Sequence, residues 1–386
     1  SDTSELDSIT DDFSYAGIDT CAVDGLCATA CPVSINTGDL TRRLRAQSVT
    51  PRGERIANWL AEHFSVTETA LGFGLRLGHL AESIIGMNGV TYIIQAAEKI
   101  TGKTLPKWNA HIPFPSKNLG ALRGLPGTAR DLLSKSGRCS GSTDLIYLPS
   151  CISRQLGTPP SPVFRPRSLS ETFLTIANRA NINLHIPKDI SGTCCGIPFN
   201  SKGYTSAYQA TSHKAILKFW EWSEGGKLPI VIDTTSCSHT LRTCSNDLSS
   251  EDLALYRQMT ILDSIEFIHD TLLPKLNLHP IDEDVILHPN CSAQKLGVQD
   301  KLVSMAKQCA RTATVPLTLG CCGFAGDRGL LFPELTQSAT EKETAEVNAR
   351  DYDGYYSSNI TCEIGMSEAT GKDYVSIVYL VERASR

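Results

Sequence analysis

Short apolar runs alternate with helical patterns in the middle of the chain. Residues 144–149, 183–186 and 229–233 are short apolar runs typical of buried strands. Between them, apolar side chains recur at helical spacing over residues 168–180 and 204–223. Strands that alternate with helices predict an α/β unit with a parallel sheet.

The same plan recurs in the last third of the sequence. Strands are predicted at residues 284–289 and around 315–319, although the third strand is not obvious, and a closing helix is predicted over 374–381. We therefore expect an α/β fold with two pseudo-repeated units that each contain a parallel sheet. The first unit would span residues 144–250 and the second residues 251–386.

The first third of the chain has a different character. Apolar side chains at helical spacing predict three or four helices between residues 52 and 101, and four prolines over residues 104–128 predict an extended segment. We expect a helical connector over residues 51–143. Residues 72–78 superficially resemble a glycine-rich nucleotide loop, but no strand precedes them and the glycine spacing is wrong, so these glycines are interpreted as helix-packing positions.

Two Cys-Cys-Gly triplets mark corresponding places in the two units. Each triplet follows the second predicted strand, and single cysteines follow the first and third strand positions. The carboxyl ends of parallel strands share one edge of a sheet, and sites lie beyond that edge. We therefore expect two clusters of four thiols, one made of Cys151, Cys194, Cys195 and Cys237 and the other of Cys291, Cys321, Cys322 and Cys362.

Four thiolates without a neighbouring histidine are the ligand set of an iron–sulfur cluster or of structural zinc. Zinc sites usually draw on C-x2-C pairs, which are absent here. A vicinal cysteine pair could also act as a redox disulfide, and buried cysteines can be small hydrophobic residues. His239, Cys244 and His288 lie near these motifs and could supply a ligand or a proton, although a structural role is the plainer interpretation.

A further cysteine motif lies near the amino terminus. Cys21, Cys27 and Cys31, which precedes a proline, fit the first, third and fourth positions of the ferredoxin run C-x2-C-x2-C-x3-C-P. Asp24 occupies the second position, where a carboxylate can replace a thiolate as a harder ligand. We interpret residues 1–50 as a partial ferredoxin-like segment with these four residues as cofactor ligands. The alternative is a remnant that binds nothing. A second run is missing, so we expect the chain to be part of a longer protein.

Composition limits the classes of partner. The net charge of −5 gives no basic field for nucleic acid. No apolar run approaches the ~18 residues of a transmembrane helix, and the polar amino terminus lacks the features of a signal peptide. Fourteen cysteines without a secretion signal indicate metal or redox chemistry. We expect a cytoplasmic protein, with peripheral association at a membrane left open.

These motifs resemble a known family. Residues 144–365 resemble a tandem pair of cysteine-rich CCG domains, as found in heterodisulfide reductase and in the iron–sulfur subunits of glycolate oxidase and glycerol-3-phosphate dehydrogenase. The stretches 19–27, 236–238 and 361–365 resemble the carboxyl-terminal part of FAD-linked D-lactate and D-2-hydroxyglutarate dehydrogenases.

The resemblance implies that a D-2-hydroxy acid is oxidised at FAD in an upstream flavin domain. Electrons would then leave through iron–sulfur (4Fe-4S) centres to a quinone, an electron-transfer flavoprotein or a cytochrome. No catalytic residue is therefore expected in this chain. The CCG pattern ends in C-x2-C, but Thr240 and Gly365 stand at its last positions, so each unit has four thiols instead of five. A 4Fe-4S cubane, zinc, and a metal-free docking or structural domain all remain open.

Overall fold

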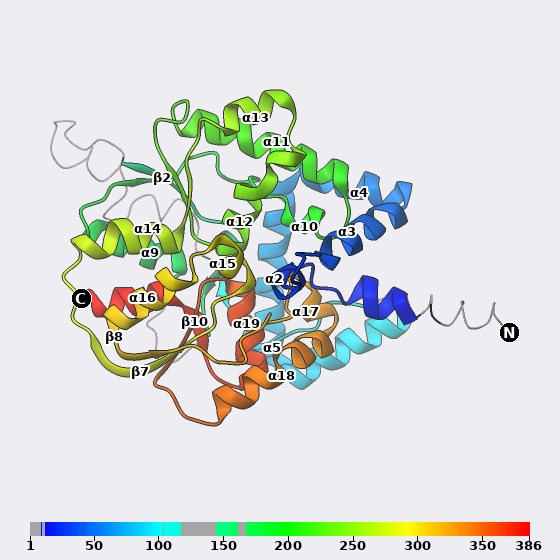
Figure 1. Ribbon diagram of the computed structural model, residues 1–386. Helices are drawn as coiled ribbons and strands as arrows, with labels where there is room; N and C mark the ends of the chain where they lie inside the picture. The colour runs from blue at the N-terminus through cyan, green and yellow to red at the C-terminus, as the bar shows by residue number, and fades with distance from the viewer. Residues whose placement is uncertain (1–8, 10–11, 103, 117–143, 161–166) are drawn as a thin grey trace.

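Two four-stranded parallel sheets form the frame of the protein (Figure 1). The computed structural model describes residues 9, 12–102, 104–116, 144–160 and 167–386, so the end of the predicted connector, residues 117–143, lies outside the described residues. The first sheet has the order β4-β2-β5-β6 and the second the order β8-β7-β9-β10. The strands of the first sheet are β2 (Leu145–Leu148), β4 (Leu184–His185), β5 (Ile230–Ile232) and β6 (Ile261–Asp263), and those of the second are β7 (Ile281–Leu287), β8 (Ala310–Thr314), β9 (Gly354–Ser357) and β10 (Tyr374–Ser376).

The two sheets have the same topology. In each, the first strand in chain order lies between the second and the third, and the fourth lies outside the third. All pairings within these two sheets are parallel. The predicted α/β class with parallel sheets is therefore confirmed. The first sheet includes β6, so it extends beyond residue 250, the predicted end of the first unit.

Two local predictions for the second unit need correction, and its third strand can now be placed. The strand expected around residues 315–319 lies at Ala310–Thr314, and the strand that was not obvious is Gly354–Ser357. The segment expected to be a closing helix begins with β10 before α20 (Ile377–Ala384) starts. An apolar run this short has no periodicity that separates a strand from a buried helix.

Helices and short turns connect the strands of each sheet. In the first repeat they are α8 (Cys151–Gln155), α9 (Leu169–Arg179), α10 (Ile197–Asn200), α11 (Thr205–Trp222), α12 (Thr235–Thr243), α13 (Ser250–Tyr256) and α14 (Ser264–Phe267), with a small antiparallel pair of β1 (Phe114–Pro115) and β3 (Leu156–Thr158). In the second repeat they are α15 (Cys291–Leu296), α16 (Gln299–Cys309), α17 (Arg328–Leu331), α18 (Pro333–Asn348), α19 (Ile360–Thr370) and α20.

Residues 37–101 form helices on the side of the molecule away from the carboxyl terminus (Figure 1). They are α3 (Thr37–Ser48), α4 (Pro51–Glu62) and α5 (Phe64–Thr101), preceded by α2 (Leu26–Ala30). Helix α5 consists of two helical stretches joined by a kink at Gly86, whose φ is 70°. With α4 they make three helices in this part of the chain, so the expectation of three or four helices between residues 52 and 101 is confirmed. Within the described part of the chain, no helix is both long and apolar enough to cross a membrane.

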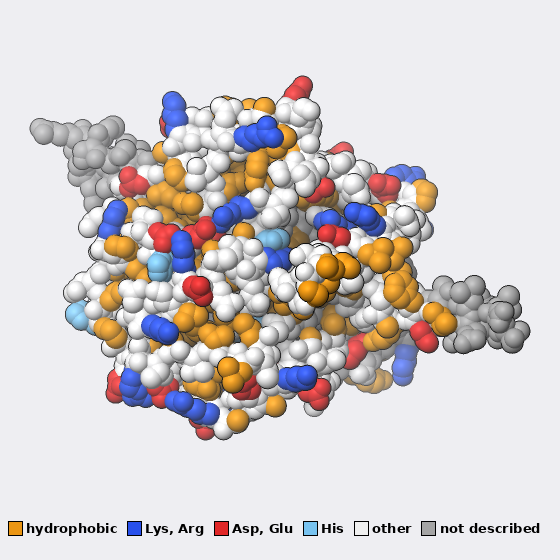
Figure 2. Space-filling model, in the orientation of Figure 1, with side chains coloured by type: hydrophobic (Ala, Val, Ile, Leu, Met, Phe, Trp, Pro, Cys, Tyr) orange, Lys and Arg blue, Asp and Glu red, His pale blue; other side chains and the backbone are white. Residues whose placement is uncertain are grey.

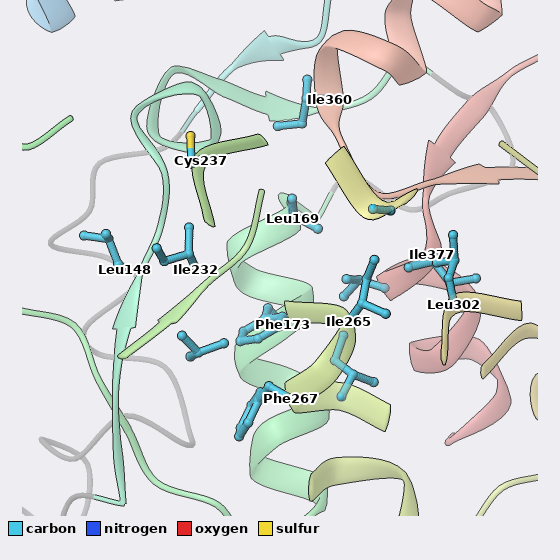
Figure 3. Packing of buried hydrophobic residues seen from close by; sticks show 14 of the residues in the cluster. Leu148, Leu169, Phe173, Ile232, Cys237, Ile265, Phe267, Leu302, Ile360 and Ile377 are labelled. Carbon is cyan, nitrogen blue, oxygen red and sulfur yellow. The ribbon is translucent and has the colours of Figure 1, made fainter. Parts of the chain in front are cut away.

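One hydrophobic core runs through both repeats. Phe173 of α9 is fully buried and stacks on Tyr147 of β2, with ring centroids 4.7 Å apart. Figure 3 shows Phe173 and Phe267 in the same interior as Ile377 of the second repeat. Helix α9 also packs on α20, where Arg179 Nη2 lies 2.8 Å from Glu382 Oε1. The repeats therefore share their packing and do not behave as two separate globules.

The surface carries charges of both signs. In the face shown in Figure 2, basic and acidic side chains alternate with hydrophobic ones and no continuous basic area is visible. This distribution agrees with the net charge of −5, and the face shown offers no footprint for a phosphate backbone.

Candidate metal centres

The four cysteines of the first repeat lie together beyond the carboxyl ends of its strands. Cys151 is the first residue of α8, after β2, and Cys237 lies in the first turn of α12, after β5. The Sγ atoms of Cys151 and Cys194 are 3.9 Å apart. Further thiol contacts join Cys194 to Cys195 and Cys195 to Cys237. The structure thus brings together all four thiols of the first predicted site.

The second repeat has the same arrangement. Cys291 is the first residue of α15, after β7, and Cys362 lies in the first turn of α19, after β9. The Sγ atoms of Cys322 and Cys362 are 3.1 Å apart. Thiol contacts also join Cys291 to Cys321 and Cys321 to Cys322. The chain of contacts runs in the same order as in the first repeat.

The glycine of each Cys-Cys-Gly triplet turns the backbone around the sulfurs. Gly196 and Gly323 have φ angles of 84° and 67°, in the left-handed region that favours glycine. Their amides donate to Cys194 Sγ and Cys321 Sγ respectively, each over 3.4 Å. A Cβ atom at Gly196 would lie 2.6 Å from the ring of Tyr208. Glycine is therefore required both for the turn and for the close packing behind it.

Each site lies where the strand order of its sheet reverses. In the first sheet, the chain leaves β2 toward one edge and β5 toward the other, and the cysteines that follow these two strands are neighbours. Ligand sites of open α/β sheets lie at this kind of switch point. The second sheet repeats the arrangement with β7 and β9. The placement predicted from the strand pattern alone agrees with this topology.

The clustered thiols resist ionisation in the absence of a cation. In Cys322, the hydrogen bond with Cys321 lowers the pKa, but the contact with Cys362 and burial raise it to about 12. The contact with Cys194 and burial likewise raise the pKa of Cys151 well above its ordinary value. Thiolates packed this closely need a positive charge between them, and a metal centre supplies it. The donor set and its burial therefore fit a soft metal ion or an iron–sulfur cluster.

A buried ion pair braces the first site. The Arg154 guanidinium pairs with Glu68 of α5, and both residues are buried. Arg154 also donates to the carbonyl oxygens of Pro149, from Nη1 over 2.8 Å, and Thr193, from Nη2 over 2.6 Å. These two carbonyls belong to the segments that lead into the cysteine loops. Glu68 accepts from Gly192 N over 2.9 Å. Sequence reasoning did not identify this brace, because nothing in the pattern around Glu68 marks it.

A buried histidine lies in the second site. His288, the residue after β7, is fully buried, and its Nδ1 lies 2.7 Å from Glu343 Oε1. Burial lowers the pKa of His288, but the Glu343 carboxylate and the Cys322 sulfur raise it overall to about 10. Among the described residues, His288, Cys322 and Cys362 form a group whose ligand atoms all lie within 4.8 Å of one another. The role of Glu343 had no local signal in the sequence.

The other candidate residues near the two sites have structural environments. Cys244 is buried and its thiol donates to Leu241 O over 3.2 Å. Burial, with the nearby charges of Lys295 and Arg242, lowers the pKa of His239 to about 4. Thr240, which stands where the CCG pattern has its fifth cysteine, donates from Oγ1 to the carbonyl of its own helix at Ser236.

The amino-terminal cysteines are partly exposed and have separate neighbours. Cys21 Sγ accepts from Val23 N, and Cys27 Sγ lies against Asn36 Oδ1, each over 3.5 Å. Cys31 follows the end of α2. In the part of the chain that the structure describes, no thiol contact joins these three sulfurs. The ferredoxin-like ligand set therefore remains a prediction.

Asp24 lies close enough to the second repeat for its charge to act there. Its carboxylate accepts from Leu26 N over 3.0 Å. The contact with Cys321 and burial raise the pKa of Cys291, and the charge of Asp24 adds to this increase. A Cβ atom at the next residue, Gly25, would lie 3.5 Å from Lys295 Nζ of α15. The ferredoxin-like turn thus packs beside the second cysteine site.

Arg45 fastens the amino-terminal segment to the rest of the protein. It is buried and donates to the carbonyl oxygens of Ile18, from Nε over 3.0 Å, Cys21, from Nη2 over 2.7 Å, and Ser201, from Nη1 over 2.6 Å.

We expect Arg45→Met to lower the free energy of unfolding by about 1.5–3 kcal/mol, because three carbonyls lose a charged donor. Urea unfolding measures the loss, and limited proteolysis should show faster cleavage near Ile18. The exposed neighbour substitution Arg43→Met should leave both unchanged; equal effects of the two substitutions would contradict this role.

Comparison with known proteins agrees with the first site. Residues 145–242 match the family model of the cysteine-rich domain named CCG. No curated protein matches the chain. The matched residues contain all four thiols of the first site, together with β2, β4, β5 and α12 up to residue 242. Residues 145–242 are thus a cysteine-rich CCG domain, which indicates an iron–sulfur or metal-binding role in electron transfer.

Proposed function

We propose that this chain is an electron-transfer module with an iron–sulfur centre at its first cysteine site and a second metal centre at its second. The observation that carries the proposal is the chain of contacts from Cys151 through Cys194 and Cys195 to Cys237, at the switch point of a parallel sheet. An iron–sulfur centre, when bound, supplies one-electron oxidation and reduction.

The residues of the chain set the properties of that site. The four thiols would hold the iron, and the Gly196 amide donates toward Cys194 Sγ, an interaction that raises the potential of a centre. The Arg154–Glu68 pair keeps the loops of the site in place and brings a charge of each sign near the Cys151 sulfur. Burial of Cys194, Cys195 and Cys237 keeps water away from the centre.

The two sites adjoin each other across the contact between the repeats. Thr235 Oγ1 at the start of α12 donates to Ser358 O over 3.1 Å, and Ser236 Oγ donates to Asn359 Oδ1 over 3.2 Å. These residues precede Cys237 and Cys362 in the chain. Helices α12 and α19, which carry the last cysteine of each site, therefore begin side by side. This contact supports structural coupling between the two sites.

We further propose that the donor is FAD in an upstream domain that oxidises D-lactate or D-2-hydroxyglutarate. The support is the resemblance of residues 19–27 and 361–365 to the corresponding dehydrogenases. The acceptor would be a quinone, an electron-transfer flavoprotein or a cytochrome. Rapid reduction of the reconstituted chain by such a flavoprotein, given its hydroxy acid, tests this donor; no reduction would contradict it.

Anaerobic reconstitution with iron and sulfide tests the iron–sulfur centre. We expect bound iron and sulfide and a broad visible absorption, both lost in Cys195→Ser because one ligand is missing. Cys244→Ser is the matched control, since Cys244 is equally buried but outside both sites. Wild-type protein that stays colourless and free of iron and sulfide would contradict the proposal. Such protein would favour the alternative of a docking or structural domain, which the missing fifth cysteine positions, Thr240 and Gly365, leave open.

A further inference from the structure

The two cysteine sites differ at one pair of positions. Three residues before the first cysteine of each site stand Leu148 and His288. Ile216 follows Cys195 by as many residues as Glu343 follows Cys322. All members of the two pairs are buried. An apolar pair in the first repeat is thus replaced by a hydrogen-bonded histidine and carboxylate in the second.

Burying a histidine and a glutamate costs desolvation free energy unless their polar atoms find partners in the interior. The hydrogen bond between His288 Nδ1 and Glu343 Oε1 satisfies one ring nitrogen. The other nitrogen, Nε2, is buried and has no hydrogen-bond partner. A ring nitrogen of His288 lies within 4.8 Å of the sulfurs of Cys322 and Cys362. Because Nδ1 is taken by Glu343, Nε2 is the nitrogen that is left for a ligand shared with the thiols.

We propose that His288 Nε2, Cys322 Sγ and Cys362 Sγ bind one divalent metal ion of the zinc class. Tetrahedral zinc with Zn–S bonds of about 2.3 Å and Zn–N bonds of about 2.0 Å holds its ligand atoms about 3.5–3.8 Å apart. The two sulfurs are 3.1 Å apart, so they need to move only slightly away from each other for the ion to bind between them. One nitrogen and two sulfurs that lie within 4.8 Å of one another therefore fit a single ion.

Glu343 acts as a positioning residue for this ion. A histidine that ligates a metal commonly donates its other ring N–H to a carboxylate, which fixes the tautomer and the ring orientation. Glu343 is itself held, because its Oε2 accepts from Gly320 N over 3.2 Å, beside the Cys-Cys-Gly turn. Cys321, in contact with Cys322, is available as the fourth ligand. When the ion binds, the protons of Nε2 and of the thiols leave to solvent.

The consequence is that the two repeats hold different centres. Zinc has no redox chemistry, so the second repeat would be stabilised by its metal while electrons pass through the first. This inference rests on the proposed function only in taking Cys322 and Cys362 as metal ligands. It does not require that the first site hold iron.

Titration of the full chain with Co²⁺ under reducing, anaerobic conditions tests this site. We expect wild type to bind one more ion per chain than the double variant His288→Leu, Glu343→Ile. The extra ion should show the visible bands of tetrahedral Co²⁺ and of thiolate charge transfer. That variant gives the second repeat the apolar pair that the first repeat carries, so it removes the nitrogen ligand without leaving a buried charge. Competition with Zn²⁺ should displace the Co²⁺.

Glu343→Gln keeps a partner for the ring and should weaken Co²⁺ binding about 10–100-fold. If the double variant does not fold, the Co²⁺ affinity of Glu343→Gln still tests the site. Equal numbers of ions and equal spectra in wild type and the double variant, or unchanged affinity in Glu343→Gln, would overturn the site. Iron and sulfide at the first site are measured separately. Their absence would contradict the proposed function and leave the cobalt result intact.

Discussion

Glu68→Gln is expected to lower the free energy of unfolding by about 3–5 kcal/mol, because it leaves the Arg154 guanidinium buried without its counter-charge. Both side chains are almost completely buried. Arg154 cannot move into solvent without giving up its bonds to the carbonyls of Pro149 and Thr193. Urea unfolding of wild type and variant measures the difference.

Two variants control for other causes of this loss. Glu68→Gln combined with Arg154→Met should recover much of the stability, because an apolar side chain needs no counter-charge. Asp189→Asn removes one member of an exposed pair with Lys218 and should cost at most about 1 kcal/mol. If Glu68→Gln cost no more than Asp189→Asn, the buried pair would not brace the fold.

The same substitution should act on one metal site only. Arg154 holds the segments before Cys151 and Cys194, and no described contact of its side chain reaches the second repeat. We expect Glu68→Gln to lose iron from the first site during dialysis against a chelator sooner than wild type does. Metal at the second site should be retained as in wild type. Equal loss from both sites would show that the effect is global unfolding.

The fold and the cysteine sites could be predicted because their information is local. The runs around Leu145 and Ile230 are short and apolar, and the cysteines follow them at the ends where a parallel sheet gathers its loops. β9 escaped prediction because Gly354–Ser357 is a four-residue strand that begins with glycine and follows charged residues. β10 was assigned to a helix because it runs directly into α20.

The residues that support the sites could not be predicted, because their partners are remote in sequence. Glu68 meets Arg154 across a separation of 86 residues, and His288 meets Glu343 across 55. Spacing rules describe contacts along one element and cannot report contacts of this kind. Asp24 illustrates a related limit. Its place in a ferredoxin run predicts a ligand beside Cys21 and Cys27, and nothing in that run signals that its charge also acts on Cys291 of the second repeat.

Phe173→Ala is expected to destabilise both repeats together, by about 3–5 kcal/mol, because it opens a cavity in the core that they share. Phe173 is fully buried, stacks on Tyr147 and lies 5.9 Å, centroid to centroid, from Phe267. Its helix α9 packs on α20, the last helix of the second repeat. A cavity at this position therefore weakens the packing on both sides of the contact between repeats.

Two buried cysteines outside the metal sites can report on each repeat separately. Cys244 in the first repeat and Cys309 in the second are 1% and 0% exposed. Pulsed thiol labelling at increasing urea, with mass spectrometry of the peptides, gives one unfolding midpoint for each. Because the core is continuous, both thiols should become reactive at the same urea concentration, and Phe173→Ala should lower both midpoints equally. Phe73→Ala, at a position that is 62% exposed, should change neither. If Cys309 stayed protected after Cys244 had reacted, the repeats would unfold independently, and each metal centre would then stabilise only its own repeat.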